Sequence, residues 1–270
     1  MPLIVQKFGG TSVGTPERIR SVAARIAAAR AEGNDLVVVV SAMGHTTDEL
    51  LALANQVSSH PPGREVDMLL TAGERISMAL LSMALADLGV KALSFTGSQS
   101  GILTTSHHRR ARIEKILGDR IRTALAEGAV AIVAGFQGMS PEKEITTLGR
   151  GGSDTTAVAL AAVLKAEKCE IYTDVDGVFS ADPRRVPSAR PISRISHEAM
   201  VELAQRGAGV LHPRSVELAQ KFRVPLWVKN SLTPGPSGGT EIVESHFDKM
   251  EATQVVGVTH DPAKAMIVLE

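Results

Sequence analysis

The segment Thr147–Thr156 reads TLGRGGSDTT and continues into Ala157–Leu164, an apolar run of good helix formers. Three glycines surround Arg150, and because glycine has no side chain, the backbone here can pass close to a ligand. Ser153 and Asp154 are residue types that cap helices, so we expect free backbone N–H groups at a helix N-terminus. Such N–H groups and an arginine both bind carboxylates and phosphates. The segment therefore predicts an anion-binding site rather than an ordinary turn.

On both sides of this segment, short apolar runs alternate with helical patterns. Residues 35–42 and 129–134 are continuous apolar runs, typical of strands that are buried on both faces of a sheet. Further strands are expected at residues 3–8, 91–95, 169–173 and 225–230, and a hairpin at 140–146. Helices are expected at 15–33, 66–88, 113–126, 157–165, 197–205 and 213–222, with another beginning near residue 47. This alternation predicts an α/β fold, a three-layer αβα sandwich with a mainly parallel central sheet.

Lys7 lies at the end of the first expected strand, directly before the glycine-rich stretch Gly9–Gly14. The residues that follow, Thr15-Pro16-Glu17, are typical of a helix start, with a capping residue, a proline and an acid. In open parallel sheets, ligands bind where strands end and helices begin. No Walker motif occurs in the sequence. We therefore expect Lys7 to reach over a phosphate group without a P-loop.

Two other segments place polar residues at expected strand or helix ends. Ser41 and Thr47 follow the second strand, where they suit either ordinary turn chemistry or a small polar substrate. Glu74 interrupts an apolar helical stretch beside Gly73. It is suited either to pairing with Arg75 or to holding a substrate ammonium group.

The composition limits the classes of function. Lys plus Arg and Asp plus Glu both number 29 in 270 residues, so no net charge recruits nucleic acid or an anionic membrane. The lone Cys169 excludes an internal disulfide and is expected to be a small core residue of a strand. The sequence has neither the pattern of a signal peptide nor an apolar run of membrane length. We expect a soluble, cytoplasmic protein with no nucleic-acid or membrane partner.

No metal cage is evident. His107–Arg110 reads HHRR, which we interpret as a solvated loop, because adjacent histidines without a third ligand make a poor zinc site. Asp174 and Asp176 lack the spacing of a calcium loop and better suit a turn that contacts a nucleotide. No metal-ligating residue is assigned. Cations and glycine amides at the strand ends suit phosphoryl transfer, in which Mg²⁺ bridges phosphates and the protein neutralises charge.

Six motifs together resemble the catalytic domain of the aspartokinases. They are Lys7–Gly14 (KFGGTSVG), Ser41–Gly44 (SAMG), Ala72–Glu74 (AGE), Thr147–Asp154 (TLGRGGSD), Tyr172–Val178 (YTDVDGV) and Val210–Arg214 (VLHPR). The resemblance covers about residues 2–243. We therefore expect an amino-acid kinase catalytic domain, of the carbamate kinase-like fold, at 1–243. Residues 244–270 resemble a linker and the incomplete start of an ACT regulatory domain, with strand fragments at 255–258 and 265–269. The chain is expected to stop inside that domain.

The resemblance implies a role for individual residues. Lys7 and Asp154 are the implied catalytic residues: Lys7 contacts the transferring phosphate, and Asp154 orients the lysines or serves Mg²⁺. The implied ATP-binding residues are Lys7, Phe8, Gly9, Gly10, Thr173, Asp174, Phe179, Arg184 and Lys229. The implied aspartate-binding residues are Ser41, Thr47, Glu74, Arg150, Gly151, Gly152 and Ser153. The family often carries a lysine where Gly209 stands here, so no role is implied at that position.

The implied reaction converts ATP and L-aspartate to ADP and 4-phospho-L-aspartate, the entry to lysine, threonine and methionine synthesis. Its chemistry agrees with the residues present, because an aspartate side chain with a pKa of about 3.9 is already ionised at neutral pH and needs no general base. ATP and Mg²⁺ are the implied cofactors. A homo-oligomer is the implied assembly, with the regulatory ACT domains missing from this chain.

Two alternatives remain at this stage. Another kinase of the same fold, acting on glutamate, acetylglutamate or UMP, shares the lysine and glycine pattern. Glu74 and Arg150 together favour a free amino acid over these acceptors, since they match its two opposite charges. A catalytically silent regulatory subunit is the second alternative, and it predicts the loss of Lys7, Asp154 or Arg150, all of which are present.

Overall fold

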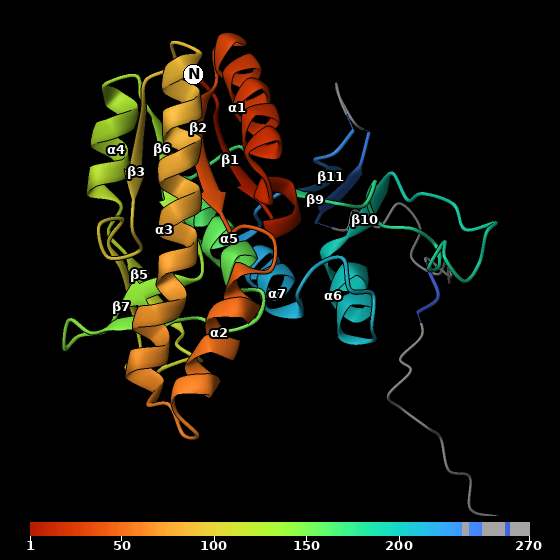
Figure 1. The fold of residues 1–270 in the computed structure, drawn as a ribbon. Helices are drawn as coiled ribbons and strands as arrows, with labels where there is room; N and C mark the ends of the chain where they lie inside the picture. The colour runs from red at the N-terminus through yellow and green to blue at the C-terminus, as the bar shows by residue number, and fades with distance from the viewer. Residues whose placement is uncertain (234–237, 245–256, 260–270) are drawn as a thin grey trace, which may run out of the picture.

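The computed structural model describes residues 1–233, 238–244 and 257–259 as two sheets with helices around them (Figure 1). An eight-stranded sheet has the order β10-β12-β11-β9-β1-β2-β6-β3, and a four-stranded sheet has the order β5-β4-β7-β8. The large sheet contains β1 (Leu3–Phe8), β2 (Asp35–Val40), β3 (Ala92–Phe95), β6 (Val130–Ala134), β9 (Lys168–Thr173), β10 (Arg194–Ser196), β11 (Leu226–Asn230) and β12 (Thr240–Val243). The small sheet contains β4 (Ile102–Thr104), β5 (Ile113–Ile116), β7 (Gln137–Met139) and β8 (Ile145–Thr147).

The large sheet is mainly parallel, as the alternation of strands and helices predicts. β1 lies at its centre between β2 and β9, parallel to both. In the described part of the chain, β12 runs antiparallel to β11 and every other pairing of this sheet is parallel. The carboxyl ends of β1, β2, β9 and β11 therefore lie along one edge, where ligands bind in open α/β sheets.

Helices cover both faces of the large sheet and give the predicted three layers (Figure 1). The helices are α1 (Pro16–Ala31), α2 (Thr46–Val57), α3 (Gly63–Asp87), α4 (Asp119–Ala126), α5 (Gly152–Leu164), α6 (His197–Gln205) and α7 (Pro213–Phe222). Side chains of β2 alternate between two cores, as a strand requires. Val37 and Val39 pack into a core shared with α4 to α7, whereas Val38 and Val40 pack into a core with α1 and α3.

Several predicted details of the elements are confirmed. Thr15 caps α1, its hydroxyl accepting from the backbone N–H of Arg18. α6 and α7 have the predicted bounds, and residues 140–146 lie in the antiparallel β7–β8 connection. Cys169 is fully buried in β9, where burial raises the pKa of its thiol, so the predicted core role is confirmed.

Two predictions about helices were wrong. Residues 113–126 do not form one helix: Ile113–Ile116 is strand β5, and Gly118, with φ of 72°, separates it from α4. Glycine adopts this left-handed conformation without strain, and Gly118 is the N-cap at which α4 begins. Ser153 and Asp154 do not cap α5, because Gly151 occupies the N-cap and both residues lie inside the first turn.

Apart from the hairpin at 140–146, the small sheet was not predicted, and neither were β10 and β12. Each of these strands has three or four residues, too few for a clear alternation of polar and apolar side chains.

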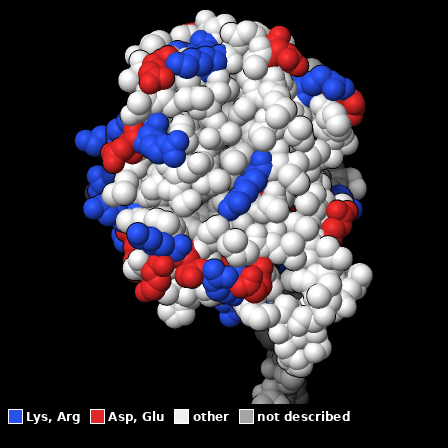
Figure 2. Space-filling view, turned by 60° about the vertical axis from the view of Figure 1, so that its left-hand side comes forward, with Lys and Arg blue, Asp and Glu red and all other residues white. Residues whose placement is uncertain are grey.

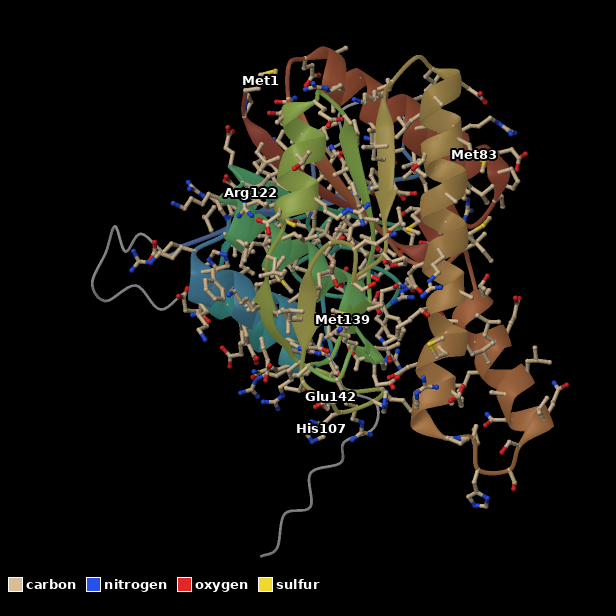
Figure 3. All side chains as sticks on the ribbon, turned by 90° about the vertical axis from the view of Figure 1, so that its left-hand side faces the viewer. Met1, Met83, His107, Arg122, Met139 and Glu142 are labelled. Carbon is tan, nitrogen blue, oxygen red and sulfur yellow. The ribbon has the colours of Figure 1, made fainter. Side chains whose placement is uncertain are left out.

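In the small sheet, Met139 and Glu142 belong to the β7–β8 hairpin, and His107 lies beside that hairpin (Figure 3). The hydroxyl of Ser106 donates to Glu142 Oε2 at 2.7 Å, which joins the two loops.

Strand fragments were expected at 255–258 and 265–269, and most of these positions lie outside the described part of the chain. Residues 257 and 258 are described and are not in a strand, whereas 255, 256 and 265–269 lie outside. The backbone N–H of Val258 donates to Ser180 O at 2.7 Å, and the hydroxyl of Thr259 contacts Arg206 O. This short segment therefore lies against the domain.

α3 has the length and apolar composition of a membrane-crossing helix, and it is the one such helix among the described residues. In the structure it packs against α1, β3 and β6, and 44% of its most apolar window is buried. It also buries two acids, Asp67 and Glu74, at 0% and 3% exposure. These contacts are those of a core helix within the α/β domain.

Charge is dispersed on the surface that includes α3 and α4. Acidic and basic side chains lie next to one another around the edge of this face, and its centre is mostly uncharged (Figure 2). The arrangement agrees with the balanced composition, since no patch of one sign on this face attracts a polyanion.

Candidate active site

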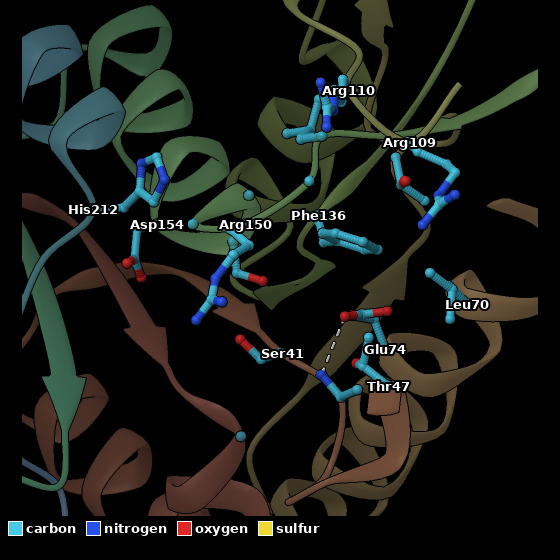
Figure 4. Close-up of a pocket in the computed structure, with 18 of the residues that line it drawn as sticks. Ser41, Thr47, Leu70, Glu74, Arg109, Arg110, Phe136, Arg150, Asp154 and His212 are labelled. Carbon is cyan, nitrogen blue, oxygen red and sulfur yellow. Dashed lines mark hydrogen bonds between the residues drawn. The ribbon is translucent and has the colours of Figure 1, made fainter. Parts of the chain in front are cut away.

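A cavity of about 1260 Å³ opens at the carboxyl ends of β1 and β2 and at the N-terminus of α5 (Figure 4). Nine of the residues predicted for catalysis or substrate binding lie in its lining: Lys7, Ser41, Thr47, Glu74, Arg150, Gly151, Gly152, Ser153 and Asp154. They come from β1, α2, α3, α5 and the loops after β2 and β8. The fold thus brings together residues that are up to 147 positions apart, between Lys7 and Asp154.

Lys7 and Asp154 form an ion pair at the base of this cavity. Lys7 Nζ lies 2.7 Å from Asp154 Oδ1, and both side chains are mostly buried, at 11% and 14% exposure. Lys7 lies near the end of β1, and Asp154 lies in the first turn of α5, where backbone N–H groups and the helix dipole favour an anion. The pair fixes a cation at the helix N-terminus, where a phosphate would be stabilised.

The glycine-rich loop before α5 adopts a conformation that requires glycine. Gly149 and Gly151 have φ of 75° and 69°. A Cβ atom on Gly151 would lie 2.3 Å from His212 Cγ, so a larger residue would displace the histidine. Arg150, between them, is exposed and extends into the cavity in Figure 4. Its guanidinium makes no hydrogen bond or ion pair within the described parts of the chain, which leaves it free for a ligand.

Glu74 is a buried carboxylate without a full set of partners. Its Oε1 accepts from the backbone N–H of Ala42 at 3.2 Å, whereas Oε2 is buried and has no hydrogen-bond partner in the described residues. Burial raises the pKa of Glu74 to about 7, against the opposing effect of the Ala42 N–H. Because an unpaired buried carboxylate is costly, a cation bound here would be stabilised. The pairing of Glu74 with Arg75, left open by the sequence, does not occur.

Gly73 explains how Glu74 reaches the cavity. A Cβ atom on Gly73 would lie 2.6 Å from the Cβ of Ala42, so glycine allows α3 to approach the end of β2 closely. This close approach places the carboxylate of Glu74 on the backbone N–H of Ala42, beside Ser41 and Thr47 in the lining.

Six of the nine residues predicted to bind the nucleotide line one of two cavities. Thr173, Asp174, Phe179 and Arg184 line a second cavity, of about 700 Å³, which also includes Val258 and Thr259. Lys7 and Gly10 line the first cavity instead. Since β1 and β9 are neighbours, the two cavities lie at the ends of adjacent strands.

Lys229 lies at the end of β11 and is held by Glu170 of β9. Lys229 Nζ lies 2.8 Å from Glu170 Oε1, which also pairs with Lys168 at 3.1 Å. Gln6 and Tyr172 donate to the other oxygen of Glu170 at 3.0 and 3.1 Å. Burial opposes ionisation of Glu170, but the hydrogen bond and charge of Lys229 lower its pKa overall. Lys229 Nζ also lies 5.3 Å from the centre of the Trp227 ring.

Three residues predicted for ATP binding lie outside both linings: Phe8, Gly9 and Lys229. The role of Phe8 in ATP binding stays a prediction, and its side chain lines neither cavity. Its ring is fully buried and stacks on Tyr172, with centroids 4.7 Å apart and planes 8° apart. A residue at the end of a buried strand keeps its alternate side chain in the core, so only the backbone of Phe8 faces the strand-end edge.

The loop 107–110 was predicted to be solvated, and His107, Arg109 and Arg110 are exposed, while His108 is half-buried. His108, Arg109, Arg110 and Arg112 line the first cavity. Arg214 donates to the backbone of both neighbouring loops, to Leu148 O at 2.9 Å and to Ala111 O at 3.1 Å. Burial lowers the pKa of Arg214, as does the nearby Arg112. The HHRR sequence alone contains no signal of this attachment.

Asp67 of α3 is the residue that anchors this loop. It is fully buried and accepts from His108 Nδ1 at 2.8 Å and from Thr147 Oγ1 at 2.6 Å. The backbone N–H of Arg109 donates to both of its oxygens at 3.1 Å. An acid in an apolar helical stretch is the one sequence feature that could have pointed to this anchor.

The described residues contain no group of three or more side chains of the metal-ligating types. Asp176 accepts from Asn230 Nδ2 at 2.7 Å, which ties the turn after β9 to the end of β11. Among the acids that line the first cavity, Asp154 is the one whose ion pair with Lys7 the structure shows.

A model of the amino acid kinase family matches residues 2–230, most of the described domain. Together with the parallel sheet, the strand-end lysine and the glycine loop before α5, this match assigns the chain to a class: it belongs to the amino acid kinase family.

Within that family, the similar proteins are aspartokinases. The chain is 62% identical over 232 residues to the aspartokinase of Geobacillus stearothermophilus, covering 86% of this chain and 57% of the relative. It is 56% identical over 271 residues to that of Mycolicibacterium smegmatis, covering 100% of this chain and 64% of the relative. The chain thus spans less than two thirds of the length of these relatives.

Solved structures agree with this relationship. The aspartate kinase of Synechocystis superposes with a TM-score of 0.80 at 52% identity, covering 92% of this chain and 40% of that one. The structure of Escherichia coli aspartokinase III in complex with aspartate and ADP superposes with a TM-score of 0.81 at 27% identity. The match covers 91% of this chain and 65% of that one. The UMP kinase of Bacillus anthracis shares the fold, with a TM-score of 0.66 at 18% identity. The match covers 91% of this chain and 97% of that one.

Proposed function

We propose that this chain is the catalytic domain of an aspartate kinase, which transfers the γ-phosphoryl group of ATP to the side-chain carboxylate of L-aspartate. The product is 4-phospho-L-aspartate, the first intermediate of lysine, threonine and methionine synthesis. The proposal is supported by the aspartokinase relatives and by a related structure that contains aspartate and ADP.

The observation that carries the proposal is the arrangement of charges in the first cavity. Lys7 and Asp154 form an ion pair in its lining, which also contains Arg150 and Glu74. An amino acid with a side-chain carboxylate carries two anionic groups and one ammonium group. Arg150 suits a carboxylate, and the buried Oε2 of Glu74 suits the ammonium, which would restore the ionised form of Glu74.

The residues have distinct roles in the transfer. Lys7 stabilises the negative charge that spreads over the transferring phosphoryl group, and Asp154 holds Lys7 in place. Backbone N–H groups at Gly151 to Ser153 orient the acceptor, with Ser41 and Thr47 as hydrogen-bonding neighbours. The acceptor carboxylate is already ionised at neutral pH, so no general base removes a proton from it.

Thr173, Asp174, Phe179 and Arg184 in the second cavity hold the nucleoside part of ATP in this proposal. Lys229 contacts its phosphates after leaving Glu170, with Gly9 and Gly10 beside them. Mg²⁺ would accompany ATP, and Asp154 would be the carboxylate of this chain that holds it, since hard oxygen donors suit this ion. Mg²⁺ bound in this way would neutralise phosphate charge.

We also propose the organisation of the whole chain. Residues 1–243 form the kinase domain, and 244–270 form a linker and the start of an ACT regulatory domain. The assembly is a homo-oligomer, in which complete ACT domains would contribute to the contacts. The reaction takes place in the cytoplasm, where the single thiol stays reduced.

The test is ATP consumption with L-aspartate, L-glutamate, N-acetylglutamate and UMP as separate acceptors. An acyl phosphate reacts with hydroxylamine, so formation of the aspartate hydroxamate identifies the product. We expect turnover with L-aspartate, abolished in the Lys7→Ala variant. Turnover with another acceptor alone would reject the substrate. A folded protein that binds ATP and turns over none of the four would reject the enzymatic role in favour of a silent subunit.

A further inference from the structure

Arg109 has a backbone conformation that is unusual for its residue type. Its φ is 65°, in the left-handed region that favours glycine. Among the described residues, four other non-glycine residues have positive φ: Phe136, Lys143, Lys165 and Arg223. Lys165 and Arg223 end helices, where this conformation is common, and Lys143 lies in the β7–β8 turn. Arg109 and Phe136 line the first cavity.

The strained conformation of Arg109 is imposed from outside the loop. The backbone N–H of Arg109 donates to both carboxylate oxygens of the fully buried Asp67, at 3.1 Å each. The preceding residue, His108, contacts the same carboxylate through Nδ1 at 2.8 Å. Arg214 holds Ala111 O on the other side. Since backbone strain persists only where the surroundings impose it, and collects at ligand sites, the loop geometry indicates a role for the side chain it presents.

The side chain of Arg109 extends into the cavity and makes no hydrogen bond or ion pair with any residue the structure describes. Figure 4 shows it extending from its loop toward the end of the cavity where Leu70 and Glu74 lie. In this view Glu74 lies between Arg109 on one side and Arg150 on the other, and Asp154 lies beyond Arg150. The cavity thus has a reacting end, at Lys7 and Asp154, and a distal end, at Arg109.

We propose that Arg109 is a further substrate-binding residue, which contacts the α-carboxylate of the amino-acid substrate, the carboxylate that is not phosphorylated. This inference rests on the proposed function. The reacting carboxylate of the substrate faces Lys7, so its other carboxylate faces the distal end. The α-ammonium and α-carboxylate share one carbon atom, so the guanidinium that binds the carboxylate has to lie near Glu74, as Arg109 and Arg150 both do.

Arg109 therefore selects for a free α-carboxylate. A guanidinium and a carboxylate form a charge-assisted hydrogen bond, which an α-amide replaces with a weaker interaction or with a repulsive contact between donors. Arg150 and Arg109 together would exclude substrates whose α-carboxyl group is blocked. Glu74 would bind the α-ammonium group of the same substrate.

The experiment compares the wild type with Arg109→Gly and with Lys143→Gly. Lys143 is a matched control, because it is also a cation at φ of 64°, in an exposed turn outside both cavities. Both variants replace a strained cation with the residue that its backbone conformation favours. Thermal unfolding of all three proteins shows that they fold. Steady-state kinetics are measured with L-aspartate, with its α-amide and with ATP.

For Arg109→Gly we expect KM for L-aspartate to rise about tenfold, with kcat and KM for ATP close to those of the wild type. The preference for L-aspartate over the α-amide, as a ratio of kcat/KM values, falls by a similar factor. Lys143→Gly leaves all of these values unchanged. Turnover of L-aspartate by Arg109→Gly with an unchanged KM and preference would overturn the role of Arg109. Absence of turnover in the wild type would instead reject the proposed function, and the inference with it.

Discussion

Lys7 Nζ lies 2.7 Å from Asp154 Oδ1, and this ion pair joins the end of the central strand β1 to the first turn of α5. The two elements that bear the strand-end lysine and the glycine-arginine loop are thereby held in one geometry. A phosphate at this position meets a cation, backbone N–H groups and a helix N-terminus together.

Loss of either partner of this pair is expected to reduce the rate of phosphoryl transfer. Lys7→Ala removes the cation. Asp154→Asn keeps the shape of the side chain but removes the negative charge that holds Lys7 in place. We therefore expect kcat to fall about a hundredfold or more in both variants. Lys91→Ala is a control, since Lys91 forms an exposed ion pair with Glu127 elsewhere. Steady-state kinetics with ATP and L-aspartate measure the effect, and a kcat within twofold of the wild type in Asp154→Asn would contradict it.

The raised pKa of Glu74 predicts a pH dependence of substrate binding. The ionised form binds the ammonium, so kcat/KM for L-aspartate should rise between pH 6 and 8, about a pKa near 7 in the free enzyme. Glu74→Gln should lower kcat/KM and remove this rise. A pH profile that is unchanged in the variant would show that another group titrates.

The same pKa predicts a stability effect with a definite sign. Folding raises the pKa of Glu74 from 4.5 to about 7, so its contribution to stability is fully present below about pH 4.5 and is lost as the pH rises through 7. We therefore expect Glu74→Gln to unfold at a higher temperature than the wild type at pH 8. At pH 5 the difference should largely vanish, and calorimetry at the two pH values measures it.

Removal of Asp67 should destabilise the domain and release the arginine-bearing loop. Its carboxylate accepts hydrogen bonds from His108, Arg109 and Thr147, so Asp67→Ala leaves buried donors without partners, at a cost of about 3 kcal/mol. Asp87→Asn, on the exposed face of the same helix, is the control. Denaturant unfolding measures the difference, and equal midpoints for the two variants would argue against the anchor.

Glu170 is expected to set both stability and the position of Lys229. Because the folded state lowers its pKa, its stabilising contribution is present above its unfolded pKa of about 4.5 and is lost as the pH falls below that value. Glu170→Gln should therefore lower the melting temperature at pH 7 more than at pH 4. We also expect a higher KM for ATP, since Lys229 and Lys168 lose their shared anion. An unchanged KM would show that Lys229 needs no positioning.

Much of the fold could be predicted because its central strands are long and buried on both faces. The run Asp35–Val40 and the helix cap at Thr15 are local patterns with one clear structural meaning. The prediction failed where the pattern was short or ambiguous. Ile113–Ile116 has apolar ends that fit a helix or a strand, and its pairing with β4 decided between them.

The site could be predicted where its residues form a local sequence pattern. Examples are the glycines around Arg150 and Lys7 before the glycine-rich stretch. Arg109 has no such local pattern, and Asp67 has only that of an acid in an apolar helical stretch, because their roles depend on a contact between residues 42 positions apart. The left-handed conformation of Arg109 is likewise a property of the folded loop. A sequence motif does not separate a backbone contact from a side-chain contact, and the buried ring of Phe8 leaves only its backbone for the predicted contact with ATP.

The position of Lys229, between the carboxylate of Glu170 and the ring of Trp227, gives the protein an optical reporter. Trp227 is the single tryptophan of the chain, and a charged ammonium lies 5.3 Å from its ring centre. In the proposed function Lys229 moves toward the phosphates of ATP, and this movement would change the electric field at the indole and its fluorescence. Nucleotide binding can therefore be followed by emission from the native protein, without a label or an engineered probe.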